Sequence, residues 1–166
     1  YAGTGKSAML GVAREAWEAE GYNVRGAALS GIAAENLEGG SGIASRTIAS
    51  LEHGWARDRD RLTSRDVLVV DEAGMIGTRQ LQRVLSEAAG AGAKVVMIGD
   101  VQQLQAIEAG AAFRLLAERH GAAEISEVRR QIAEWMREAT RAFATGRTGE
   151  AIAAYSNAGM VHAADT

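Results

Sequence analysis

The sequence contains neither cysteine nor proline. Without cysteine there is no disulfide and no thiolate metal site, and this absence agrees with a cytoplasmic location. No apolar run approaches the roughly 18 residues that a membrane span needs. No basic segment followed by an apolar stretch marks a secretion signal. We therefore expect a cytoplasmic protein without a membrane span.

A strong charge of one sign is also missing. The 18 lysines and arginines are set against 21 aspartates and glutamates, which leaves a net charge of −3. Nucleic-acid-binding domains are usually strongly basic, so charge alone does not indicate DNA. The length of 166 residues fits one domain, and we expect a single domain over 1–166. The chain starts at Tyr1 inside a motif, which indicates a fragment of a longer protein.

The chain alternates predicted strands and helices. An unbroken apolar run at 67–70 is typical of a strand buried on both faces, and 94–98, in which four apolar residues follow Lys94, is predicted to be another. The segments 22–29 and 123–125 are further predicted strands. Helical spacing of apolar residues occurs at 7–20, 32–37, 45–55, 78–89, 109–119, 132–144 and 150–155. We expect Glu38-Gly39-Gly40 to close the second of these helices. The alternation predicts an α/β fold with a doubly wound, mostly parallel sheet flanked by helices.

The first residues match the end of a phosphate-binding loop. The Walker A pattern is G-x-x-x-x-G-K-[ST], and its last part is present as Gly3, Thr4, Gly5, Lys6 and Ser7. Its first glycine and the strand before it would precede the chain. Glycines let backbone N–H groups point at phosphate oxygens, and the following helix adds its positive end. Lys6 would contact the β- and γ-phosphates of ATP, and the Ser7 hydroxyl would bind Mg²⁺.

A pair of carboxylates follows the buried strand at 67–70. Asp71 and Glu72 stand where side chains emerge at the ligand-bearing edge of an α/β sheet. We interpret Asp71 as the Walker B partner of Mg²⁺ and Glu72 as the general base for water. An isolated Asp-Glu pair is more often a turn, but the phosphate-loop motif favours the catalytic interpretation.

An amide follows the next predicted strand in the same way. Gln103 lies in Gly99-Asp100-Val101-Gln102-Gln103-Leu104, directly after 94–98. From there it could hydrogen-bond the γ-phosphate or the attacking water and report hydrolysis to the rest of the protein. A glutamine in a loop is usually a surface residue. The role of Gln103 is therefore supported only by its position after the predicted strand.

Four segments, taken in order, resemble motifs of superfamily one DNA helicases of the RecD-like branch. They are GTGKS, VLVVDEAGM, VVMIGDVQQLQAIEAGAAF and EVRRQ. Two further segments resemble in particular the helicase region of TraA-type conjugative-transfer relaxases: RGAALSGIAAENLEGGSGIASRTIASL and GRTGEAIAAY. The likeness covers essentially the whole chain. It implies a RecA-like P-loop NTPase fold, the first of two motor domains, with ATP and Mg²⁺ as cofactors. It also implies single-stranded DNA, a second RecA-like domain and the conjugation machinery as partners.

The resemblance implies roles for further residues. Arg130 matches the motif IV arginine, which would stabilise charge developing on the γ-phosphate. Its neighbour Arg129 is ambiguous and fits a solvated residue at a helix start better than Arg130 does.

A second set of residues matches elements that line the single-strand path in these helicases. Ser30 and Gly31, with Ala33 and Ala34, match motif Ia, and Thr47 matches a T-x-x-x-L element. Backbone N–H groups and hydroxyls can contact DNA phosphates there without reading bases. The alternative, that the small residues only allow close helix packing, is equally open.

The chain also departs from the family pattern. Val101 replaces a common proline, and Ala49 stands where many relatives have a histidine beside the strand. His53, His120 and His162 follow no metal-ligand spacing, so we treat them as structural or surface residues. The metal site and catalytic tyrosine of a relaxase domain are not expected in this chain, so we assign no nicking residue.

The leading hypothesis is an ATP-dependent DNA helicase domain. A P-loop ATPase that is not a helicase is the alternative. A third possibility is a module that binds nucleotide but is inactive in isolation, because catalysis needs groups from the partner domain.

Overall fold

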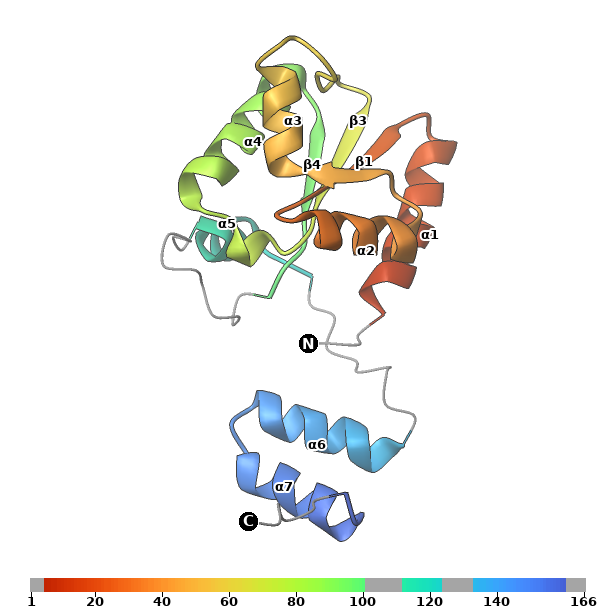
Figure 1. Ribbon diagram of the computed structural model, residues 1–166, viewed down its shortest axis with the longest axis vertical. Helices are drawn as coiled ribbons and strands as arrows, with labels where there is room; N and C mark the ends of the chain where they lie inside the picture. Colours follow the sequence, from red (N-terminus) through yellow and green to blue (C-terminus); the bar gives the residue numbers. More distant parts are fainter. Residues whose placement is uncertain (1–4, 101–111, 124–132, 161–166) are drawn as a thin grey trace. The chain divides into compact units, whose positions relative to one another are not determined.

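The computed structural model describes residues 5–100, 112–123 and 133–160. Its sheet has four strands: β1 (Asn23–Ala28), β2 (Ser45–Thr47), β3 (Asp66–Val70) and β4 (Lys94–Met97). They pair in the order β2-β1-β3-β4, and every pair is parallel (Figure 1). This confirms the predicted parallel α/β architecture. Among the described helices, none is both long and apolar enough to cross a membrane.

The described helices belong to two units, and helices of the unit that contains the sheet cover both of its faces. The helices of both units are α1 (Lys6–Ala19), α2 (Gly31–Ser41), α3 (Ile48–Trp55), the short 3-10 helix η1 (Ala73–Met75), α4 (Thr78–Ala91), α5 (Ala112–His120), α6 (Glu134–Ala144) and α7 (Thr148–Asn157). Helices α1 and α2 cover one face, while α3 and α4 cover the other. The sheet is therefore the middle layer of three.

Strand β3 supplies the core of both faces. Every residue of this strand is buried. Val67 and Val69 pack into the cluster with α1 and α2, whereas Leu68 and Val70 pack into the cluster with α3 and α4. Because successive side chains of a strand point to opposite faces, a continuous apolar run satisfies both clusters.

The charged connection between α3 and β3 is anchored through the hydrogen bonds and ion pair of Asp60. The Asp60 carbonyl accepts hydrogen bonds from Trp55 Nε1 at 3.2 Å and from an Arg25 guanidinium nitrogen at 3.0 Å. The Asp60 carboxylate pairs with Arg46 at 2.7 Å. The hydrogen bond and charge of Arg46 lower the pKa of Asp60. This connection is thus tied to β1 through Arg25 and to β2 through Arg46.

Two local expectations from the sequence are wrong. Helix α2 does not end at Gly39-Gly40 but continues to Ser41, and Gly42 (φ 70°) caps it by donating to the Glu38 carbonyl at 2.7 Å. The helix predicted at 45–55 is in fact strand β2 followed by α3. Three residues are too few to show the periodicity of a strand, so the sequence pattern did not separate β2 from the helix that follows it.

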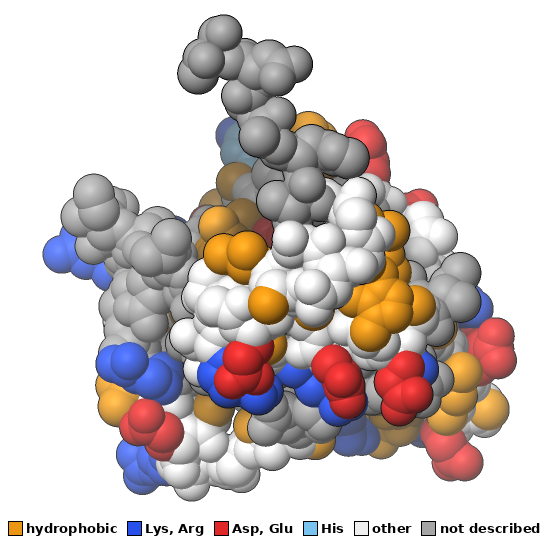
Figure 2. Space-filling model, turned by 90° about the horizontal axis from the view of Figure 1, so that it is seen from below, with side chains coloured by type: hydrophobic (Ala, Val, Ile, Leu, Met, Phe, Trp, Pro, Cys, Tyr) orange, Lys and Arg blue, Asp and Glu red, His pale blue; other side chains and the backbone are white. Residues whose placement is uncertain are grey.

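Helices α6 and α7 form a small hairpin in a second unit, separate from the compact unit of residues 7–123. Trp135 meets Tyr155 edge to face with ring centroids 5.3 Å apart. The buried core of the hairpin consists only of alanines, while Phe143 and Ile152 are 47% and 50% exposed. Figure 2 shows hydrophobic side chains at the surface among acidic and basic ones. The predicted strand at 123–125 lies almost entirely outside the described residues.

We predict that Gly26→Ala lowers the free energy of unfolding by about 1–3 kcal/mol, the usual range for overpacking. The new methyl group would lie 2.9 Å from Ser45 Cβ and 3.0 Å from Leu37 Cδ2. Adding Ser45→Gly should recover part of this loss in urea denaturation. Gly90→Ala is the matched control, because nothing lies within 4 Å of that position in α4. It should stabilise the fold, since alanine is the better helix former.

Candidate functional site

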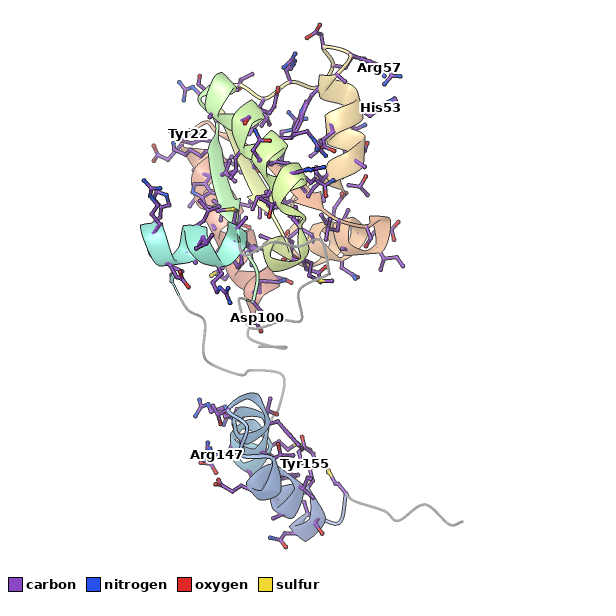
Figure 3. All side chains as sticks on the ribbon, turned by 90° about the vertical axis from the view of Figure 1, so that its left-hand side faces the viewer. Tyr22, His53, Arg57, Asp100, Arg147 and Tyr155 are labelled. Carbon is purple, nitrogen blue, oxygen red and sulfur yellow. The ribbon has the colours of Figure 1, made fainter. Side chains whose placement is uncertain are left out.

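Polar residues gather where the parallel strands end. Ser30 follows β1, Thr47 closes β2, Asp71 and Glu72 follow β3, and Asp100 follows β4. Figure 3 shows Asp100 at one end of the unit and the His53–Arg57 pair at the other. Because all strands run in the same direction, their carboxyl ends share one edge, which is the usual ligand side of such sheets.

The phosphate-loop residues that the structure describes have the expected backbone. Gly5 has φ 77°, a left-handed conformation that glycine adopts without strain. Helix α1 begins at Lys6 and has no acidic residue in its first turn. Its positive end is therefore not neutralised from within the helix, which suits an anion such as a nucleotide phosphate. Gly3 and Thr4 lie outside the described residues.

Ser7 packs beside the last turn of α2. A methyl group built on Gly40 would lie 2.8 Å from both Cβ and Oγ of Ser7. A larger residue at 40 would therefore displace the side chain expected to bind Mg²⁺. Gly40 is thus a packing position inside α2 rather than the helix end that its sequence suggests.

Asp71 and Glu72 form a tight, strained turn. Asp71 is 7% exposed, and its Oδ1 accepts the backbone N–H of Glu72 at 2.8 Å. Glu72 has φ 52° and ψ 37°, a left-handed conformation that costs a non-glycine residue about 1–2 kcal/mol. Such strain is often retained at functional sites, where it fixes the direction of a side chain.

The turn is also bonded to the neighbouring strand end. Ala73 N–H donates to the Ile98 carbonyl at 2.8 Å, and Ile98 N–H donates to the Val70 carbonyl at 2.8 Å. The segments that follow β3 and β4 are therefore fixed to one another. Gln103 and Arg130, the two other predicted catalytic residues, lie outside the described residues.

The donor groups fit Mg²⁺ bound mainly through a nucleotide. The described residues contain no cluster of three or more histidines, aspartates or glutamates that could enclose a metal. Mg²⁺ keeps several waters and usually takes one or two protein oxygens together with phosphate oxygens. The Ser7 hydroxyl and the buried Asp71 carboxylate are ligands of this kind, so the residues fit a Mg²⁺–ATP site.

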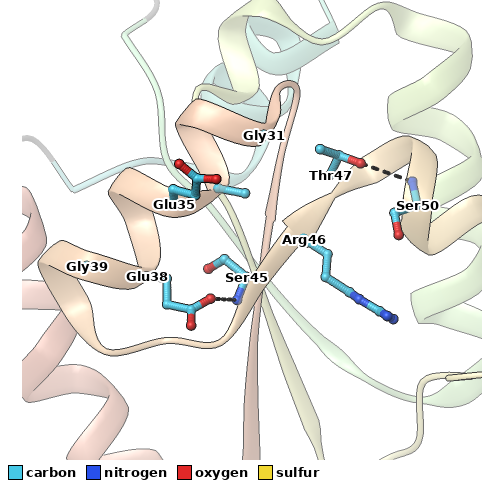
Figure 4. Close-up of a pocket in the computed structure, with 9 residues that line it drawn as sticks. Gly31, Glu35, Glu38, Gly39, Ser45, Arg46, Thr47 and Ser50 are labelled. Carbon is cyan, nitrogen blue, oxygen red and sulfur yellow. Dashed lines mark hydrogen bonds between the residues drawn. The ribbon is translucent and has the colours of Figure 1, made fainter.

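A second feature is a cleft of about 560 Å³ between α2, β2 and α3 (Figure 4). Both helices begin beside it with hydroxyl caps. Ser30 Oγ accepts Ala33 N–H at 3.2 Å, and Thr47 Oγ1 accepts Ser50 N–H at 3.2 Å. Two predicted DNA-contact residues, Gly31 and Thr47, line this cleft, and Ser30 caps the helix that starts at Gly31.

Charged residues that the sequence did not single out also line the cleft. Arg46 supplies a cation, held by its ion pair with Asp60. Glu35 and Glu38 place carboxylates on another wall, and Glu38 accepts the Ser45 N–H at 2.9 Å. Arg46 was not singled out because β2 was predicted as part of a helix. In a helix, Arg46 would have been only a solvated residue.

Comparison with known proteins decides the family. The model of the AAA domain family matches residues 1–166. The chain belongs to this family. It is 51% identical over 154 residues to the conjugal transfer protein TraA of Rhizobium radiobacter, covering 93% of this chain and 14% of the relative. The ATP-dependent RecD2 DNA helicase of Deinococcus radiodurans is 30% identical over 136 residues, or 80% of this chain and 19% of that protein.

The likeness extends to a further conjugation protein. The multifunctional conjugation protein TraI of Escherichia coli is 35% identical over 105 residues, or 60% of this chain and 6% of TraI. The resemblance inferred from the motifs is thereby confirmed. The chain spans about one seventh of the length of the TraA protein it matches, since it covers 14% of it.

We predict that glycine is more stabilising than alanine at position 72. Both replacements remove the carboxylate, but only glycine adopts φ 52° without strain. Glu72→Gly should exceed Glu72→Ala by about 1 kcal/mol in free energy of unfolding. The same pair of substitutions at Glu18, inside α1, should show the opposite order. An equal or reversed order at 72 would contradict the strained conformation.

Proposed function

We propose that the chain is the ATP-binding and ATP-hydrolysing motor domain of a DNA helicase or translocase in a conjugative-transfer protein. The observation that carries this proposal is the strained Asp71–Glu72 turn at the carboxyl edge of the parallel sheet. The motifs GTGKS and GDVQQL and the named functions of the relatives support it.

Each residue has a distinct role in the proposed hydrolysis. Lys6 neutralises charge on the β- and γ-phosphates, and Ser7 and Asp71 hold Mg²⁺, which polarises the phosphates when bound. Glu72 accepts a proton from the water that attacks the γ-phosphorus, while the bond from that phosphorus to the bridging oxygen breaks.

Two further residues complete the proposed reaction. Gln103 orients the attacking water or the γ-phosphate, and Arg130 stabilises the charge that develops there. Both follow from motif position. Because they would link the γ-phosphate to a second motor domain, hydrolysis would change how the two domains grip the strand.

The cleft between α2 and α3 is the proposed path of single-stranded DNA. The N-terminal ends of both helices border it, and such ends attract phosphates. Ser30, Gly31 and Thr47 provide backbone N–H and hydroxyl groups, and Arg46 adds a positive charge. These contacts address the DNA backbone rather than the bases, as a translocase requires.

We predict that Lys6→Ala and Glu72→Gln have different effects in the full-length protein that carries this domain. Lys6→Ala should weaken nucleotide binding and abolish hydrolysis stimulated by single-stranded DNA. Glu72→Gln should keep nucleotide binding but lower kcat by about 100-fold or more, since only the proton acceptor is lost. Phosphate release and calorimetric nucleotide binding measure both.

The outcomes also separate the competing functions. An unchanged stimulated rate in Lys6→Ala would refute the ATPase assignment. Turnover without any response to single-stranded DNA would favour an ATPase that is not a helicase. The 166-residue chain alone should bind nucleotide and release little phosphate, because catalytic groups are expected from the partner domain.

We predict that Gly31→Asp weakens binding of single-stranded DNA about tenfold, because it places a negative charge at the proposed phosphate contact. The fold should tolerate the change, since nothing lies within 4 Å of a methyl group built there and an acid suits a helix start. Gly31→Ala is the uncharged control and should bind DNA like the unmodified protein. Fluorescence anisotropy with a labelled oligonucleotide measures both. Equal affinity of the two variants would place the DNA elsewhere.

A further inference from the structure

Two glycines bring the turn after β3 into direct contact with the end of β4. A methyl group built on Gly99 would lie 2.9 Å from the backbone nitrogen of Gly74 and 3.2 Å from that of Ala73. One built on Gly74 would lie 2.8 Å from the carbonyl oxygen of Asp100. Backbone atoms cannot move aside as side chains can. The two segments therefore touch backbone to backbone, with no room for a side chain between them.

The ring of Phe113 covers this contact. The same built methyl groups would lie 3.6 Å from Cδ1 of Phe113 at Gly74 and 3.0 Å from Cε1 at Gly99. One edge of the ring thus faces both glycines. Phe113 is partly buried and also packs against the apolar cluster of α3 and α4. Through this side chain, α5 rests on η1 and on the end of β4 at once.

The contact lies within two residues of the proposed general base. Glu72 immediately precedes η1, and its left-handed backbone sets the direction in which its Cα–Cβ bond leaves the chain. Ala73 N–H is bonded to the Ile98 carbonyl, so a shift at the end of β4 is passed to the Glu72 turn. A misplacement of about 1 Å can lower the rate of a positioned reaction by about 100-fold.

We propose that Phe113 is a positioning residue for catalysis. It holds the Gly74–Gly99 contact closed and thereby keeps the Glu72 carboxylate in place for proton transfer. It acts through Glu72 and needs no contact with nucleotide. This inference rests on the proposed function, in which Glu72 is the general base.

The test is steady-state ATP hydrolysis by the full-length protein with Phe113→Ala. We expect kcat to fall about 10- to 100-fold while KM for ATP changes less than about threefold, because the phosphate loop is untouched. Phe113→Leu should recover most of the lost kcat, since a branched apolar side chain still covers both glycines. Gly99→Ala should lower kcat in the same selective way by forcing the two backbones apart.

Leu116→Ala is the matched control. Leu116 lies on the same helix and packs against the same apolar cluster, but it lines the groove between α4 and α5. This variant should lose thermal stability to a similar extent as Phe113→Ala and keep kcat within about twofold of the unmodified protein. The selective fall in kcat then distinguishes positioning from general destabilisation.

Glu72→Gln, measured in parallel, separates failure of this proposal from failure of the proposed function. If Glu72→Gln retains full hydrolysis, the assignment of the base is wrong, and the role of Phe113 falls with it. If Glu72→Gln is inactive but both Phe113→Ala and Gly99→Ala keep full kcat, the positioning role alone is overturned. An equal loss of kcat in Leu116→Ala would also overturn it, because packing of α5 would then suffice as the cause.

Discussion

Strand β3 is the element on which the rest of the structure depends. Its residues are fully buried, and they pair with β1 on one side and β4 on the other. Its alternate side chains pack into the apolar clusters on the two faces of the sheet. A truncation in this strand would remove contacts from a cluster that no other element can fill, at a cost of about 2–5 kcal/mol for a large core side chain.

The same strand positions the two carboxylates that we propose for Mg²⁺ binding and catalysis. A completely buried strand ends in a carboxylate, which accepts the Glu72 N–H, and a strained glutamate, and the next residue, Ala73, donates to the Ile98 carbonyl. Flexible loops place side chains less accurately than this arrangement does, because here the backbone N–H groups of Asp71, Glu72 and Ala73 all have partners. The stability of the core is thereby used to hold one conformation that an isolated turn would not adopt.

The sequence predicted the parts of the fold that repeat a simple pattern. Buried strands such as β3 and β4 were found because unbroken apolar runs are distinctive, and Asp71 was found because it follows such a run. Strand β2 was missed because three residues carry no period. The role of Gly40 was misread because a glycine that ends a helix and one that lets two helices approach look the same in sequence.

Part of the site could not be predicted for a related reason. The contacts of Arg46 with Asp60 and of Phe113 with Gly99 join residues far apart in sequence, and no local pattern encodes them. Only the fold brings these partners together. Motifs in the sequence therefore indicate the groups proposed to bind a nucleotide, while the residues that pack around those groups are found only in the fold.

The strand order affects how the chain can fold while it is being synthesised. Synthesis proceeds from the N-terminus, so β1 and β2 can pair early, but β1 then presents an edge of unpaired backbone N–H and C=O groups until β3 has been made. The central ladder closes only after the whole α3 connection has emerged. Partially synthesised chains that stop before Val70 should thus be the ones that chaperones retain, because they expose the edge that β3 later covers.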